Sequence, residues 1–114
     1  MTLRECYEQM GSNYDDVIAR FPNEAIIKKF AIKFVDDTSY PDLEKALENK
    51  DVKEAFRAAH TLKGVCVNLG FDELYNASSE LTELLRKETL EGSEELFAVV
   101  KGKYTKTIDA IKSM

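Results

Sequence analysis

The most constraining feature of this sequence is the spacing of its apolar residues, which recur three and four positions apart in nearly every segment. Such spacing places them on one face of an α-helix, and no stretch shows the period of two that a half-buried strand requires. The sequence therefore predicts an all-α protein. The candidate helices cover residues 2–10, a short segment from Tyr14, 23–37, a stretch near Pro41, 52–69, 72–87 and 94–114.

Residues typical of helix ends support this division. Asn23 is a candidate N-cap, and Gly70 follows the long segment 52–69 at a position where a C-cap glycine is expected. Pro41 occupies a place that a first helical turn tolerates. Four substantial segments with short connections predict an antiparallel four-helix bundle over about 23–113, with the additional short N-terminal helices and the stretch near Pro41 packed on it.

The size and charge of the chain narrow its class. Its 114 residues fit one domain, 1–114, and its net charge of -5 argues against binding to nucleic acid or to an anionic membrane. No apolar run approaches the length of a membrane span, and no signal-peptide pattern opens the chain. We therefore expect a cytoplasmic protein. The initial methionine favours a freestanding protein, and the charged helix faces favour a monomer.

The cysteines and the histidine predict no metal site. Cys6 and Cys66 lie far apart and form no CxxC pair, and the chain has one histidine. A tetrahedral zinc site would need carboxylate ligands from elsewhere in the fold. Two thiols in a domain with an adequate core are typical of a reduced cytosolic protein.

The segment 52–69 carries the single histidine, in the run AAHTLKGVCVNLG. At about 100° per residue, His60 lies roughly 130° from the centre of the apolar face, so it is expected at the surface. Gly64 lies one turn further on and leaves the surface beside the ring bare, although a glycine inside a helix costs roughly 1 kcal/mol relative to alanine. The residues expected on the core face are Val52, Ala55, Ala59, Leu62, Cys66 and Leu69.

Positive charge is expected around this histidine. The basic residues of the same surface are Lys53, Arg57 and Lys63, whereas Asp51 and Glu54 are expected to point elsewhere. A cationic patch around an exposed imidazole favours anionic oxygens on or beside the ring. The pattern suggests phosphoryl transfer to a histidine nitrogen. On these residues alone, a surface histidine without function is an open alternative.

The run His60-Thr61-Leu62-Lys63-Gly64, followed by Leu69-Gly70, resembles the core motif of the histidine-containing phosphotransfer (HPt) domain family. The resemblance extends over about residues 20–110, and GFDELYNASSELTELLR is similar to the helix that follows the motif in that family. It implies a four-helix bundle whose exposed histidine accepts a phosphoryl group from an aspartyl phosphate and passes it to another aspartate.

The resemblance also implies roles for individual residues. His60 would be the phosphoryl acceptor through Nε2, Lys63 would contact the phosphoryl oxygens, and Gly64 would leave room for the partner. The remaining candidates for partner docking are Lys53, Arg57, Val67 and Asn68, with Val67 in an apolar rim. The implied partners are receiver domains of response regulators and a hybrid sensor histidine kinase. The resemblance places Mg²⁺ and the reacting aspartate on the receiver, so no cofactor is expected on this chain.

Other functions compete with this interpretation. No glycine-rich phosphate loop is present, so we expect a phosphocarrier without ATP-dependent kinase activity of its own. An HPt-like adaptor that docks on a receiver or kinase without carrying phosphate is the main alternative, although it would have no chemical need for His60 and Lys63. A metal-dependent hydrolase on a helical bundle needs Glu-x-x-His pairs that one histidine does not supply. A purely structural bundle would be indifferent to loss of His60.

Overall fold

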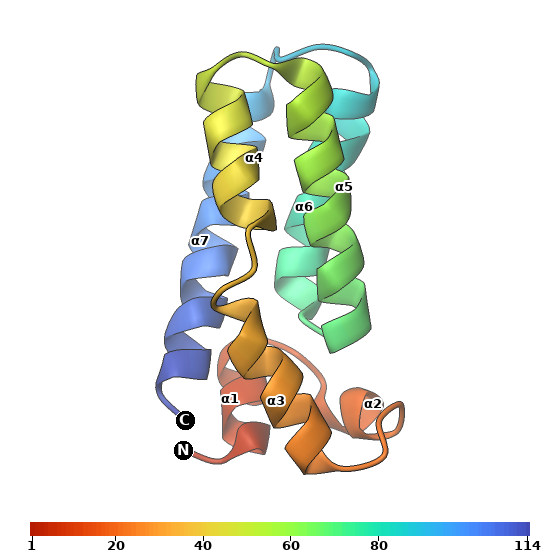
Figure 1. Ribbon diagram of the computed structural model, residues 1–114, viewed down its shortest axis with the longest axis vertical. Helices are drawn as coiled ribbons and strands as arrows, with labels where there is room; N and C mark the ends of the chain where they lie inside the picture. Colours follow the sequence, from red (N-terminus) through yellow and green to blue (C-terminus); the bar gives the residue numbers. More distant parts are fainter.

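The computed structural model describes all residues, 1–114, and contains helices and turns only (Figure 1). The seven helices are α1 (Leu3–Gln9), α2 (Tyr14–Ile18), α3 (Glu24–Phe34), α4 (Ser39–Glu48), α5 (Val52–Leu69), α6 (Asp72–Arg86) and α7 (Ser93–Lys112). No helix is long and apolar enough to cross a membrane. The predicted all-α class is confirmed.

Helices α4 to α7 form an antiparallel four-helix bundle, and α1 to α3 gather at one of its ends (Figure 1). Helix α5 packs between α4 and α6, and α7 packs on the other side of α6. The Tyr40 ring of α4 stacks on two rings of α7, with centroid distances of 3.8 Å to Tyr104 and 5.7 Å to Phe97. These stacked rings close the bundle between its first and last helices.

One bundle helix was assigned wrongly from the sequence. The segment 23–37 was expected in the bundle, but α3 packs across its end, and the helix near Pro41, α4, lies in the bundle instead. Residues 35–38 separate the two helices, and the Asp37 carboxylate accepts a hydrogen bond of 2.9 Å from the Ser39 amide at the start of α4. Both helices have an apolar stripe, and periodicity specifies a buried face without specifying what covers it.

The N-terminal helices cover the turn between α5 and α6. The buried Tyr7 hydroxyl donates a hydrogen bond of 2.7 Å to the carbonyl of Leu69, and Arg20 Nη1 donates one of 3.1 Å to the carbonyl of Val67. The Ser12 hydroxyl accepts a hydrogen bond of 3.0 Å from the Asp72 amide. The last carbonyls and the first amides of helices lack partners within the helix, so these bonds satisfy both ends at once.

Candidate functional site

Helix α5 is fixed at both ends and along its buried face. The Asp51 side chain accepts a hydrogen bond of 3.2 Å from the Glu54 amide, and Gly70 ends the helix with a left-handed φ of 74°. The expected core face is confirmed, except that Val52 is only half-buried. Its buried members are Ala55, Ala59, Leu62, Cys66 and Leu69.

The opposite face of α5 presents His60 to solvent, as predicted. Its ring lies 5.8 Å, centroid to centroid, from the ring of Phe56 one turn earlier. The buried Ala59 and Leu62 hold the backbone on either side of the histidine against the rest of the bundle. A rigid helix therefore carries an imidazole that another molecule can approach.

Gly64 opens the surface beside this imidazole. A methyl group built at its Cα would meet no heavy atom within 4 Å, so nothing inside the protein requires a glycine there. Lys63, next to it, is half-buried and belongs to the same side of the helix as His60. The three motif residues thus lie together around an open patch.

The surrounding charge differs from the expected basic patch. The Glu54 carboxylate holds the Arg57 guanidinium at 2.7 Å, and both side chains line a cleft beside α4, so Arg57 is not a free cation next to His60. Lys53 lies with Phe56 and Arg86 in a shallow cleft between α5 and α6. The angular positions of Lys53 and Arg57 around the helix predicted that both lie on one exposed face. They did not show that Arg57 pairs with Glu54 or that Lys53 lies against α6.

Helix α6 adds an acidic residue that the sequence analysis missed. Glu83 pairs with Arg86 at 3.2 Å, and the pKa of Glu83 is lowered, mainly by the hydrogen bond from Arg86. Positive charge on Arg86, Lys63 and His60 lowers this pKa further. A carboxylate on the neighbouring helix therefore adds negative charge on the α6 side of the motif.

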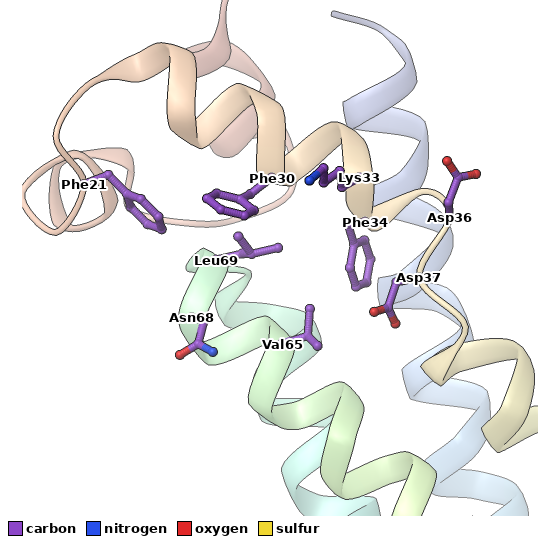
Figure 2. Close-up of a pocket in the computed structure, with 9 residues that line it drawn as sticks. All are labelled: Phe21, Phe30, Lys33, Phe34, Asp36, Asp37, Val65, Asn68 and Leu69. Atoms are coloured by element: carbon purple, nitrogen blue, oxygen red, sulfur yellow. The ribbon is translucent and has the colours of Figure 1, made fainter.

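An apolar groove of about 560 Å³ continues from the motif toward α3 (Figure 2). Its α5 wall contains Val65 and Asn68, one turn beyond Thr61 and Gly64. The aromatic wall opposite consists of Phe21, Phe30 and Phe34, with Lys33, Asp36 and Asp37 at the margin. Val67, on the exposed face, is 45% accessible, and Phe30 is 42% accessible. The aromatic wall was not predicted because it is formed by α3 and by Phe21 just before it, and α3 was expected inside the bundle.

The two cysteines and the acidic residues form no further site. Both thiols are free and buried, and burial raises the pKa of each, that of Cys6 to about 11. A raised pKa keeps a thiol protonated and unreactive. No group of three or more His, Cys, Asp or Glu side chains is arranged to hold a metal ion.

A comparison with known protein families identifies the family of this chain. The model of the Hpt domain family matches residues 37–113, which include α4 to α7 and the whole His60 motif. This chain belongs to the Hpt domain family. Proteins of this family serve as histidine phosphocarriers in phosphorelays, where they interact with receiver domains and kinases. No curated protein and no solved structure is significantly similar to the chain.

Proposed function

We propose that this protein accepts a phosphoryl group on Nε2 of His60 from the aspartyl phosphate of a receiver domain and passes it to the aspartate of another receiver. The observation that carries the proposal is the exposed imidazole beside the empty space over Gly64, within the segment that matches the family. A partner's reacting group must come within bonding distance of the ring, and this patch gives it room.

The transfer step uses the lone pair of the imidazole nitrogen. This pair attacks phosphorus, the P–O bond of the acyl phosphate breaks, and its electron pair leaves on the aspartate carboxylate. Lys63 would contact the phosphoryl oxygens and offset their charge as the group moves. Onward transfer reverses these bond changes, with the carboxylate of the next receiver as the nucleophile. The Mg²⁺ that assists this chemistry would be held by carboxylates of the receiver.

The receiver would cover the exposed face of α5 and the adjoining groove. The exposed Val67 and Asn68 extend this face beyond Gly64. Across the groove from Asn68, Phe30 continues it onto α3 (Figure 2). An apolar centre with a charged margin is the composition expected of a modest, transient interface. Lys53 and Arg57 flank the face on opposite sides, so we assign them to its rim.

A labelling experiment tests the proposal directly. A receiver domain charged with a small phosphodonor is incubated with the wild-type chain and with His60→Gln, and the label on this chain is followed. Because the sequence contains one histidine, acid-labile and alkali-stable label on the wild type alone identifies phosphorylated His60. Binding to receivers without any label would refute the transfer function and favour the adaptor.

A further inference from the structure

The α6 side of His60 carries a chain of contacts that the phosphorelay motif does not include. Arg86 holds the Glu83 carboxylate at 3.2 Å, and its guanidinium carbon lies 5.0 Å from the centre of the Phe56 ring. The Phe56 ring in turn lies 5.8 Å from the ring of His60. The ion pair is therefore separated from His60 by the Phe56 ring, and it lies on the helix that packs most extensively against α5.

Arg86 connects α6 to α5 through its contact with the Phe56 ring, whereas the ion pair itself has little structural role. Both side chains are more than half exposed, and an exposed pair of this kind contributes little to the stability of a fold. Its position next to the phosphoryl acceptor is the feature that needs a reason. Attraction to the positive charges of Lys63 and His60 contributes to the lowered pKa of Glu83, in keeping with this position.

We infer, building on the function proposed above, that Glu83 shortens the lifetime of the phosphoryl group on His60 and so favours its onward transfer. A phosphoryl group brings about two negative charges to the ring, and the neighbouring carboxylate repels them. This repulsion raises the free energy of the phosphorylated state relative to the free histidine. Arg86 moderates it because it partly neutralises Glu83.

The lifetime is measured without any partner protein. Phosphoramidate transfers its phosphoryl group to His60 with release of ammonia, and the donor is then removed. Hydrolysis breaks the P–N bond: a water oxygen joins phosphorus, the nitrogen keeps the electron pair, and inorganic phosphate leaves. Intact-protein mass spectrometry follows the loss in wild type, Glu83→Gln and Glu95→Gln. Glu95 supplies the matched control, since it is exposed at the start of α7, diagonally across the bundle from α5.

The expected result is a half-life about two- to fivefold longer for Glu83→Gln than for wild type at low ionic strength. In roughly 1 M salt this difference should shrink, because exposed charges are screened over a few ångströms. Arg86→Gln should shorten the half-life, and Glu95→Gln should leave it unchanged. A merely structural role of Glu83 would give no such salt dependence.

Two failures are distinguishable. Equal half-lives for wild type and Glu83→Gln, or a difference that persists in high salt, would overturn the role of Glu83 while leaving His60 as the acceptor. A wild-type chain that acquires no phosphohistidine from phosphoramidate or from charged receivers would overturn the proposed function, and the role of Glu83 with it.

Discussion

Replacing Gly64 with alanine should make the protein more stable and less active. Gly64 lies inside α5 with helical backbone geometry, and an added methyl group meets no heavy atom within 4 Å. Alanine loses less backbone entropy than glycine on folding, so Gly64→Ala should raise the free energy of unfolding by about 0.5–1 kcal/mol. For a domain of this size the gain corresponds to a rise in melting temperature of roughly 4 °C.

The same methyl group occupies space that we assign to the partner. A displacement of about 1 Å between reacting groups costs up to about 100-fold in rate, so we expect phosphoryl transfer from a charged receiver to slow by at least about tenfold. Gly64→Gln, with a larger side chain, should slow it further. Phosphorylation by phosphoramidate should change far less, because this small donor needs little room.

Gly102 provides a matched control. It lies inside α7, and a methyl group at its Cα also meets no heavy atom within 4 Å. Gly102→Ala should therefore raise the melting temperature by a similar amount without affecting transfer. Thermal denaturation followed by circular dichroism and single-turnover transfer of labelled phosphate measure the two quantities on the same samples.

One combination of results would refute the reasoning about Gly64. If Gly64→Ala gained stability but accepted phosphate from receivers as fast as wild type, the open patch would not be where the receiver approaches. A loss of stability would instead show that the space beside His60 is filled in solution, contrary to the structure.

Three further predictions concern single residues. Lys63→Ala should slow transfer from a receiver roughly 10- to 100-fold with little change in melting temperature, and Lys63→Arg should recover part of the rate. Gly70→Ala should cost about 2–4 kcal/mol in urea denaturation, since its φ is 74° and the new methyl group would lie 2.2 Å from Val17 Cγ2. Burial raises the pKa of Tyr40 to about 12 from 10, so its neutral form contributes stability that is complete below pH 10 and lost as the pH rises through 12. Tyr40→Phe should weaken this alkaline dependence in melts between pH 9 and 12, and an unchanged slope would contradict it.

The parts of the fold that the sequence predicts are those decided within one helix. Residues from Asp51 to Gly70 include an N-cap, a core face and a C-cap within one continuous segment, and the exposure of His60 follows from its angle to that face. These features depend on residues three and four positions apart, and the spacing of apolar residues in the sequence indicates them directly. The helix boundaries and the acceptor face were therefore predictable.

The parts that the sequence does not predict are contacts between helices. The sequence predicted α3 as a bundle helix, but the structure has α4 in that place. Which helix joins the bundle depends on which apolar faces pack against each other, and many such pairings are compatible with the same periodicity. The contact of Arg86, and with it the Glu83 pair, on the Phe56 ring depends on the register in which α6 packs against α5. The aromatic wall of the groove likewise depends on where α3 lies.

Three glycines show that a glycine required by backbone geometry can be distinguished from one that the fold itself does not require. Gly70 is required by its positive φ, whereas Gly64 and Gly102 are helical and have empty space where a side chain would be. Empty space around a helical glycine therefore does not by itself indicate a functional site, since Gly102 has the same empty space. What distinguishes Gly64 is its setting, with an exposed imidazole one turn before it and an exposed valine, Val67, three positions after it. A helix interior would be more stable with alanine at this position, and the proposed approach of a receiver domain to the ring would account for the glycine.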